Sequence, residues 1–446
     1  MTATIKKSTP HQPPPVKVDI FYALITLGSS TVWTFLDSWL LYFYLPPEGA
    51  PLVPAALYGL ATFITRVVNA LITPPIGHLS DQTRSRWGRR LPFMFASALP
   101  LLIFYTLLWI PPKSHQSTWN LLYLMLILGL YNVAYVFNQV PYMALLPEIA
   151  STDHHRVRTS AWTSSFMLLG VILGGLAGPA ISTLGYPKAA LLYAGALLPV
   201  FYLPFLVLRE RPDHRSVATR RLDFRHSIAL MFRNRAFLIM TATGVFYWGM
   251  ATLIVAVTPY IVTEICLLDQ GSAWIFYIPA VMASLLCYPV ITRLSNRLGK
   301  WKVFTGSLLA SAIVMPSLML IGDWFPIALK IQGLIWITLQ AMAMSGVVML
   351  PPAFGAEIVD HDAELTGQRR EGTYYAFWGF LDQVINGLVS LMLPLLLLLG
   401  RSRSDPHGPL GVRMVGVIGG VMLFVAFLIF LRYPLRKRSF PQGGPG

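Results

Sequence analysis

A series of long apolar runs is the feature that most constrains what this chain can fold into. The runs recur from one end of the sequence to the other, and each is roughly twenty residues long, enough for a helix to cross about 30 Å of bilayer hydrocarbon. Backbone polar groups cannot stay unpaired in hydrocarbon, so only helices and closed barrels cross a membrane. Because the runs lack the apolar–polar alternation of barrel strands, the sequence predicts an all-α membrane protein.

About twelve membrane-spanning helices are expected, joined mostly by short connections that place neighbouring helices antiparallel. The expected spans are 18–46, 52–79, 91–111, 119–146, 159–183, 188–208, 236–265, 272–291, 303–322, 326–352, 373–399 and 411–432. An even number of spans puts both termini on the same side of the membrane.

Charge is scarce and unevenly placed. Only 12% of the residues are charged and 55% are hydrophobic, whereas a soluble domain is roughly 25% charged. The formal net charge of +15 comes from basic residues that gather in alternate connections, the pattern of loops on the cytoplasmic side; Arg401 and Arg403 are the exception. We expect an integral multi-pass protein of a plasma or inner membrane, with both termini cytoplasmic, in contact with membrane lipids and not with nucleic acid.

A weak internal repeat divides the chain. The segment LSDQTRSRWGRR (79–90) follows the second expected span, and LSNRLGKWK (294–302) follows the eighth. Such a repeat is typical of transporters built from two pseudo-symmetric halves around a central site. The expected organisation is an N-terminal six-helix half at 1–208, a basic cytoplasmic linker with an amphipathic segment at 209–235, and a C-terminal six-helix half at 236–446.

Motifs of enzyme and pump chemistry are missing from the sequence. It contains no phosphate-binding GxxxxGK[ST] loop and no GxSxG nucleophile turn. Its two cysteines, Cys266 and Cys287, lie in or near apolar segments and fit neither a disulfide framework nor a metal site. We therefore expect no enzyme activity, no cofactor and no bound metal.

Three segments carry a family resemblance. They are GHLSDQTRSRWGRRLPF (77–93), NQVPYMALLPEIA (138–150) followed by DHHRVRTS, and AEIVDHDAELTGQRREGTYYAFWGF (356–380). In these segments, in length and in number of spans, the chain resembles the glycoside–pentoside–hexuronide:cation symporter family (melibiose-permease-like) of the major facilitator superfamily. The resemblance implies the major facilitator fold and secondary transport by alternating access.

Charged residues in these segments are expected to form a cytoplasmic gate between the halves. An acid at a helix end beside an arginine cluster can latch neighbouring helices and release them during a conformational change. The expected gate residues are Asp81, Arg86, Arg89, Arg90, Arg156, Arg158, Glu357, Asp360, Asp362, Arg369, Arg370 and Glu371. The acids of the third segment are expected to face Arg369 and Arg370 or the arginines after the second and fourth spans. The alternatives are arginines that only set topology and bind lipid phosphates, and a solvated charged loop.

Polar residues inside the spans are the candidate site residues, because charge is costly in lipid. Arg66, Asn69 and Thr73 share one face of the second span. The expected substrate and coupling site is Ser30, Asp37, Arg66, Asn69, Thr73, Gln139, Asp382 and Gln383.

The chain departs from the family it resembles at this site. Where the family has membrane carboxylates on its first, second and fourth helices, this chain has Ser30, Asn69 with Thr73, and Gln139. The positions of a sugar-stacking tryptophan, an arginine and a lysine are Met143, Ser164 and Gln383. Acids and bases are lost together, and with them the hard oxygen ligands that sodium prefers.

Three hypotheses for the driving force remain. In the first, Asp37 and Asp382 carry a proton in place of the missing acids, since burial favours the protonated form of a carboxyl group, and Arg66 pairs with Asp37 until a proton or substrate competes. The second is an uncoupled facilitator, and the third a relocated sodium site. We expect a proton rather than sodium as the coupling ion; a structural hydrogen bond between packed helices is the alternative role for both aspartates.

The substrate is expected to be a small molecule, a sugar or glycoside. Hydroxyl and amide side chains suit its hydroxyl groups, and rings to stack on it are available from Trp33, Tyr247, Trp248 and Trp378. The alternatives are a lysolipid or other amphiphile as substrate, and a non-transporting membrane sensor on the same scaffold. The chain is expected to be a monomer or a weak dimer.

Overall fold

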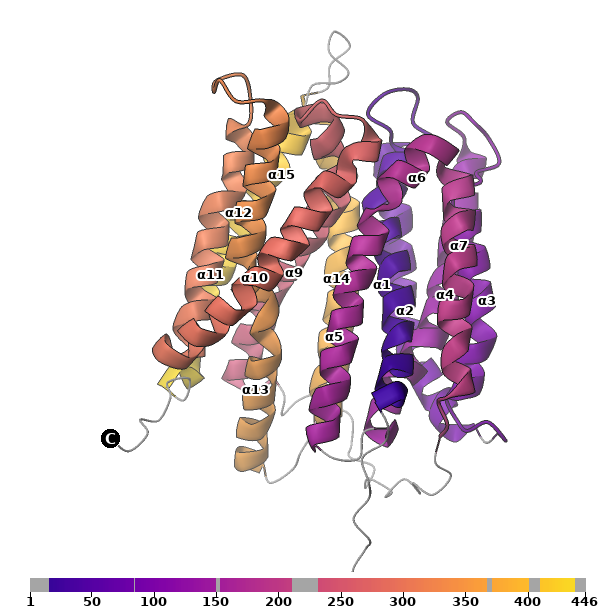
Figure 1. Ribbon diagram of the computed structural model, residues 1–446, viewed down its shortest axis with the longest axis vertical. Coiled ribbons are helices and arrows are strands. Elements are labelled where there is room, and N and C mark those ends of the chain that lie inside the picture. Colours follow the sequence, from indigo (N-terminus) through magenta and orange to yellow (C-terminus); the bar gives the residue numbers. More distant parts are fainter. Residues whose placement is uncertain are drawn as a thin grey trace, which may run out of the picture.

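Long helices make up nearly all of the described chain and stand side by side in one bundle (Figure 1). The computed structural model describes residues 16–83, 85–149, 153–210, 232–366, 371–400 and 410–437. Within these residues, eleven helical stretches are long and apolar enough to cross a membrane, and the shorter apolar helix α3 (Leu91–Leu107) brings the number to twelve. The predicted all-α fold with about twelve spans is confirmed.

The first six spans form the right-hand part of the bundle in Figure 1 and the last six form the left-hand part, with α5 and α14 in the centre. The first six are α1 (Val16–Tyr44), α2 (Ala55–Gln82), α3, α4 (Thr118–Ile149), α5 (Asp153–Gly175) with α6 (Ala177–Leu184), and α7 (Tyr186–Tyr202) with the turn η1 (Leu203–Leu206). The last six are α9 (Arg235–Tyr260) with η2 (Ile261–Ile265), η3 (Gln270–Ala273) with α10 (Trp274–Leu298), α11 (Lys300–Val314) with η4 (Met315–Leu320), α12 (Leu329–Met349) with α13 (Pro351–Thr366), α14 (Glu371–Leu396), and α15 (Leu410–Phe430) followed by η5 (Pro434–Lys437). We call the two sets the N-half and the C-half.

The start of α1 and η5, the last described element, lie at the same end of the bundle, the lower end in Figure 1. We call this end the terminal side and the other end the opposite side. The expected linker, 209–235, lies mostly outside the described residues.

The internal repeat has a structural counterpart on the terminal side. Gly88 and Gly299 have φ angles of 106° and 87°, a region that side-chain-bearing residues rarely adopt. A basic residue follows each glycine and binds a backbone carbonyl near the end of its half's fourth span: the Arg90 guanidinium donates to a carbonyl of α4, and Lys300 Nζ donates to a carbonyl of α13 at 3.4 Å. The connection after the second span is therefore built alike in the two halves.

The acidic segment after the tenth span is a helix and not a solvated loop. Phe354, Ile358 and Val359 of α13 are at most 3% exposed, and their spacing places them on one helical face. Burial of this face explains why the helical chain continues to Thr366, beyond the expected end of the span at 352.

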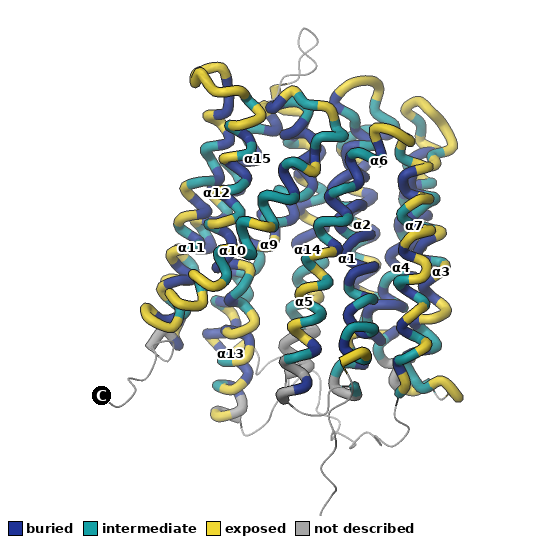
Figure 2. The backbone as a smooth tube through the Cα atoms, viewed as in Figure 1, coloured by how far each residue is buried: buried dark blue, intermediate teal, exposed yellow. Residues whose placement is uncertain are grey.

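Apolar side chains cover much of the outer surface as well as the core. Exposed and buried positions alternate along each helix (Figure 2). Leu71, Leu191 and Leu286 are 64%, 63% and 72% exposed. Such a surface suits hydrocarbon, because lipid tails are as apolar as leucine.

Candidate substrate and coupling site

An ion pair joins α1 and α2 inside the membrane-spanning part of the bundle. Arg66 Nη2 donates to Asp37 Oδ1 at 3.0 Å, and the two side chains are 20% and 11% exposed. The other carboxylate oxygen, Asp37 Oδ2, is buried without a hydrogen-bond partner in the described chain. The pairing suggested by the sequence is thus present, and it leaves one buried acceptor.

Asp382 of α14 brings a third charge from the C-half. It lies within electrostatic range of both Arg66 and Asp37. Asn386, one turn further along α14, donates its Nδ2 to Asp382 Oδ2 at 3.1 Å and accepts a hydrogen bond from Thr252 Oγ1 of α9. We call Asp37, Arg66 and Asp382 the charge cluster; helices from both halves form and support it.

Asn386 and Thr252 were not predicted from the sequence. The spacing of four residues between Asp382 and Asn386, which places both on one helical face, is the signal that could have identified the first. Thr252 is far from both in the sequence, and no local pattern indicates its contact.

Tyrosines of α4 and α9 flank the charge cluster. Tyr135 of α4 lies within electrostatic range of all three charges, and Tyr247 of α9 lies within range of Asp382. The sequence suggested Tyr247 but not Tyr135, because aromatic residues are common in membrane helices. A phenol hydroxyl can donate to a carboxylate or to a substrate hydroxyl, so both are suited to the site.

Ser30 and Gln139 take part in helix packing. Ser30 Oγ donates to the Thr26 carbonyl at 2.6 Å, and a Cβ added at Gly170 of α5 would come within 2.0 Å of this oxygen. Gln139 Nε2 donates to the neighbouring Asn138 Oδ1 at 3.1 Å. The structure therefore places Ser30 in the contact between α1 and α5, with its hydroxyl bonded inside its own helix.

Asn69 and Gln383 each retain an unused acceptor. Asn69 is 3% exposed, and its Oδ1, like Gln383 Oε1, is buried without a hydrogen-bond partner in the part of the chain that the structure describes. Thr73 donates to the Asn69 backbone carbonyl at 2.8 Å, so its hydroxyl is used within α2. A hydroxyl-bearing ligand is the kind of donor that the two amide oxygens lack.

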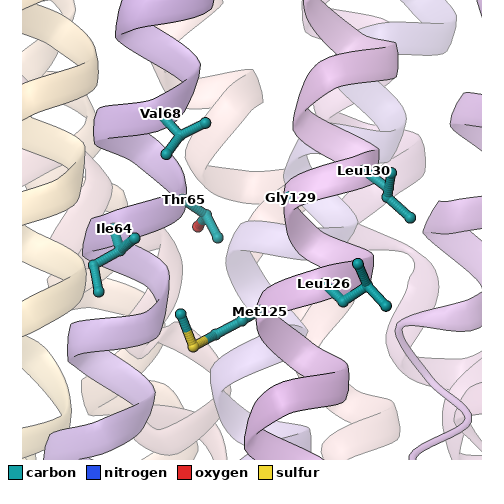
Figure 3. A pocket seen from close by; sticks show the side chains of 7 residues that line it. All are labelled: Ile64, Thr65, Val68, Met125, Leu126, Gly129 and Leu130. Carbon is teal, nitrogen blue, oxygen red and sulfur yellow. The ribbon is translucent and has the colours of Figure 1, made fainter.

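A groove between α2 and α4 is lined by none of the charge-cluster residues (Figure 3). It has a volume of about 270 Å³ and is lined by Ile64, Thr65, Val68, Met125, Leu126, Gly129 and Leu130. Leu126 is 61% exposed and Val68 is 43% exposed. The groove is thus an open, apolar part of the outer surface and supplies no charge or amide to the site.

Hydroxyl groups join the two halves near the opposite side. Ser38 Oγ of α1 lies 2.7 Å from Tyr277 Oη of α10, and Tyr260 Oη donates to the Leu45 carbonyl at 2.8 Å. The rings of Tyr42 and Tyr260 are 4.9 Å apart. We call these five residues the opposite-side seal; no motif or spacing in the sequence indicated it.

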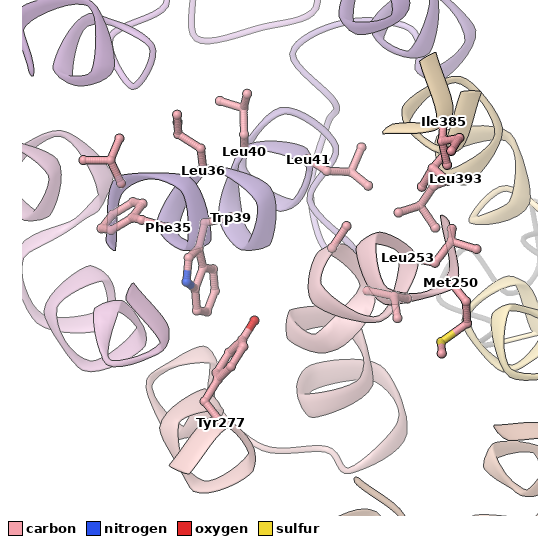
Figure 4. Close-up of a cluster of buried hydrophobic side chains, with 14 of the residues drawn as sticks. Phe35, Leu36, Trp39, Leu40, Leu41, Met250, Leu253, Tyr277, Ile385 and Leu393 are labelled. Atoms are coloured by element: carbon pink, nitrogen blue, oxygen red, sulfur yellow. The ribbon is translucent and has the colours of Figure 1, made fainter. Parts of the chain in front are cut away.

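Apolar side chains reinforce the opposite-side seal (Figure 4). Trp39 of α1 points toward Tyr277, and Leu41 extends toward Leu253 of α9 and Leu393 of α14. Leu41, Leu253 and Leu393 are at most 5% exposed. In Figure 1, α5 and α10 lie together near the opposite side and diverge toward the terminal side.

A buried acid, Asp19, binds α1 to α5 on the terminal side. Its carboxylate is 0% exposed and lies 2.7 Å from His155 Nε2. Arg158 Nε donates to it at 2.6 Å and Thr159 Oγ1 at 2.7 Å. Arg158 was expected in a gate between the halves, but this ion pair lies within the N-half. Asp19 was missed, because its partners are more than 130 positions away in the sequence.

Glu357 also pairs within its own half. Its Oε2 lies 2.8 Å from Lys300 Nζ, so the pair links the α10–α11 connection to α13, and not to the arginines expected from the sequence. Asp362 is 3% exposed, whereas Asp360 is exposed.

The connection before α3 is fixed by Glu210, which was not among the residues predicted from the sequence. Its carboxylate accepts from the backbone amides of Arg89, Arg90 and Leu91, the last at 2.8 Å. A carboxylate at a helix N-terminus stabilises the unpaired amides there. Arg86 is exposed. Other expected gate residues lie outside what the structure describes. The side chains of Asp81, Arg156 and Glu371 are not described, and Arg369 and Arg370 are not described at all.

Two six-helix halves that meet around buried charges define the class of protein: a secondary transporter with the major facilitator fold. A solved structure of a proton dependent oligopeptide transporter has the same fold, with a TM-score of 0.69 and 15% sequence identity over 95% of this chain and 100% of that one. The chain matches the MFS/sugar transport protein family over residues 21–437. It belongs to this family, and the resemblance to the glycoside–pentoside–hexuronide:cation symporters is confirmed. The protein is an integral multi-pass transporter of a small molecule and not an enzyme.

Two relatives show how the similarity is distributed. The chain is 35% identical to an uncharacterized symporter of Synechocystis, in a match that covers 34% of this chain and only 28% of that protein. It is 24% identical to the glucuronide carrier protein homolog of Escherichia coli over 94% of this chain and 93% of that protein.

Proposed function

We propose that the protein moves a neutral sugar or glycoside together with one proton, by alternating access between its halves. The observation that carries this proposal is the charge cluster, in which Asp37 and Arg66 of the N-half meet Asp382 of the C-half. Neutralisation of a charge at the boundary between the halves can shift the equilibrium between conformations in which the halves are arranged differently.

The charge count supports coupling to one monovalent cation. With both carboxyl groups ionised, Asp37 and Asp382 carry two negative charges and Arg66 carries one positive charge, so the cluster has one negative charge in excess. An uncompensated charge inside a membrane protein is costly. Binding of one proton makes the cluster neutral, and its release restores the charge.

A proton fits the cluster better than sodium does. Hard metal cations take several oxygen ligands at once, whereas a proton needs one carboxylate oxygen, and the guanidinium of Arg66 repels a metal ion from the space beside it. Asp37 Oδ2 is a buried oxygen without a partner in the described chain, and Asp382 is the second candidate.

The same charge count favours a neutral substrate. A uronic acid would add a second uncompensated negative charge to the cluster, whereas a neutral polyol adds none. The acceptors Asn69 Oδ1 and Gln383 Oε1 and the hydroxyl of Tyr135 suit sugar hydroxyl groups. The name of the glucuronide carrier homolog applies to that protein; for this chain we propose a neutral glycoside.

The terminal side is cytoplasmic in this proposal, because arginines and lysines gather in its connections. The segment 209–235 then links the halves on the cytoplasmic side. The opposite-side seal closes the other entrance in the described arrangement, and it must open for substrate to enter from outside.

The test is uptake of labelled neutral glycosides and of labelled uronic acids into proteoliposomes. Each is measured with a proton gradient, with a sodium gradient and with none, for the wild type, for Asp37→Asn, and for the exposed-site control Glu48→Gln. Accumulation of a neutral glycoside under the proton gradient, lost in Asp37→Asn and kept in Glu48→Gln, is the expected result. Equal uptake under all three conditions identifies a facilitator and refutes coupling, and accumulation of a uronic acid alone refutes the neutral substrate.

A further inference from the structure

Asn386 occupies a position from which it can control Asp382. It is 6% exposed, and Thr252, which donates to its Oδ1, is 7% exposed. Its Nδ2 donates to Asp382 Oδ2 at 3.1 Å. A hydrogen-bonded chain therefore runs from α9 through the amide to the carboxylate at the boundary between the halves.

The direction of this chain depends on the charge of Asp382. An ionised carboxylate only accepts hydrogen bonds, so the amide must present its NH₂ group to it and its oxygen to Thr252, whose hydroxyl then donates. If Thr252 could not donate, the amide oxygen would lose its partner, and the hydrogen bond to the carboxylate alone would hold the amide in this orientation. With its oxygen turned to the carboxylate, the amide would repel the charge that it now stabilises.

Asp382 is also surrounded by groups from the other helices. Arg66 of α2, Asp37 of α1, Tyr135 of α4 and Tyr247 of α9 lie within electrostatic range of it. α14 lies very close to α2 at this level, since a Cβ added at Gly387 would come within 3.4 Å of Arg66 Cβ. Small changes in where the carboxylate points therefore change its distance from Arg66.

We propose that Asn386 and Thr252 are positioning residues for Asp382: the amide holds the carboxylate toward Arg66 and the hydroxyl fixes the orientation of the amide. The pair sets how readily Asp382 takes up a proton and links that event to α9. This inference rests on the proposed function, in which Asp382 belongs to the coupling site.

The experiment is an infrared titration of the purified full-length protein, without substrate. A protonated carboxyl group has a carbonyl stretching band that the carboxylate lacks, and Asp382→Asn identifies the band of Asp382 by removing it. Thr252→Val is nearly isosteric but cannot donate, and Asn386→Leu removes the amide. Thr252→Ser keeps the donor. Ser390→Ala is a matched control, because Ser390 donates to the backbone carbonyl of Asn386, at 2.7 Å, and not to the amide side chain.

Loss of a donor that stabilises the charged form makes the carboxylate hold its proton to higher pH. We expect the midpoint of the Asp382 band to rise by about one pH unit in Asn386→Leu, as loss of a hydrogen bond to a charged group predicts, and to rise in Thr252→Val as well. Thr252→Ser and Ser390→Ala keep the wild-type midpoint. Thermal unfolding of each variant shows whether it is folded.

Two negative outcomes are distinguishable. If the Asp382 band titrates but all variants share the wild-type midpoint, Asn386 and Thr252 only pack α14 against α9, and the positioning role is refuted. If no band disappears in Asp382→Asn at any pH at which the protein is folded, Asp382 does not exchange a proton. Its place in the proposed coupling site is then refuted, together with this inference.

Discussion

Replacement of Arg66 by methionine should destabilise the protein more than replacement of either acid, because one guanidinium compensates two carboxylates. In Arg66→Met, Asp37 and Asp382 face each other without a counter-charge. In Asp37→Asn, Arg66 still has Asp382 within electrostatic range. The larger effect of Arg66→Met follows from the composition of the charge cluster and not from burial. The Arg66 side chain is 20% exposed and that of Asp37 only 11%, so burial alone would predict the opposite order.

The magnitudes follow from the geometry. Removal of one partner of a buried ion pair costs about 3–5 kcal/mol, and the partial exposure of Arg66 places Arg66→Met near 3 kcal/mol. Asp37→Asn loses one charge-assisted hydrogen bond, worth about 1.5 kcal/mol. The loss in Arg66→Met is largest at neutral and higher pH and shrinks as the pH falls, because protons then neutralise the two carboxyl groups.

Reversible unfolding in detergent, measured for both single variants and for the double variant Arg66→Met/Asp37→Asn, checks these values. The double variant should be more stable than Arg66→Met alone, because it removes one of the two uncompensated charges. If the two sites were independent, the two losses of unfolding free energy would instead add to about 4.5 kcal/mol in the double variant. That additive result, or an Arg66→Met loss that does not change with pH, would refute the charge cluster as an interacting unit.

Three further predictions concern the remainder of the bundle. Asp19→Asn should lower the free energy of unfolding by about 3 kcal/mol, since it leaves Arg158, which is 27% exposed, without its acid. The exposed-site control Glu48→Gln should change the free energy of unfolding by less than about 0.5 kcal/mol; chemical unfolding measures both. Tyr260→Phe removes one hydrogen bond of the opposite-side seal, worth about 1 kcal/mol. In a protein whose other cysteines have been replaced, it should raise the rate at which a membrane-impermeant thiol reagent labels Ser38→Cys about fivefold. An unchanged labelling rate would count against the seal. Glu210→Ala should cost about 1–2 kcal/mol through loss of the carboxylate at the start of α3, and hydrogen exchange of the first-turn amides of α3 should speed up while exchange elsewhere does not.

The sequence was sufficient for the spans and for the charged residues that lie inside them. Apolar runs locate the helices because lipid requires about twenty apolar residues for each crossing, and Asp37, Arg66 and Asp382 stand out because charge is rare inside spans. It was insufficient for α13, because the expected span ended at 352 and a solvated charged loop remained one interpretation of the acids. The apolar face with Ile358 and Val359, at most 3% exposed, is what makes that segment helical.

Contacts between distant helices explain the rest of the differences. Helical periodicity tells which residues share a face, and so relates Asn386 to Asp382, but it does not tell which other helix the face meets. Thr252, Asp19 and the tyrosines of the opposite-side seal all bind partners on other helices or beyond a helix end. The ion pair between Glu357 and Lys300 is also a contact that the sequence could not predict. Several basic residues were equally good candidates as partners of Glu357 by their spacing in the sequence.

The chemistry of the two kinds of contact between the halves indicates which one controls the change of conformation. The opposite-side seal consists of hydroxyl groups, a carbonyl and aromatic rings, and each such hydrogen bond is worth only about 1 kcal/mol when it is exchanged for water. The charge cluster cannot separate as cheaply, because an ion left without its partner in a poorly hydrated place costs about 3 kcal/mol or more. The hydrogen bonds of the seal are therefore inexpensive to open, whereas movement of α2 relative to α14 depends on how many charges the cluster holds. In the proposed mechanism, a proton on Asp382 removes the attraction between α14 and Arg66 while Asp37 still neutralises the arginine. We therefore expect the protein to change its open side most easily when one proton is bound.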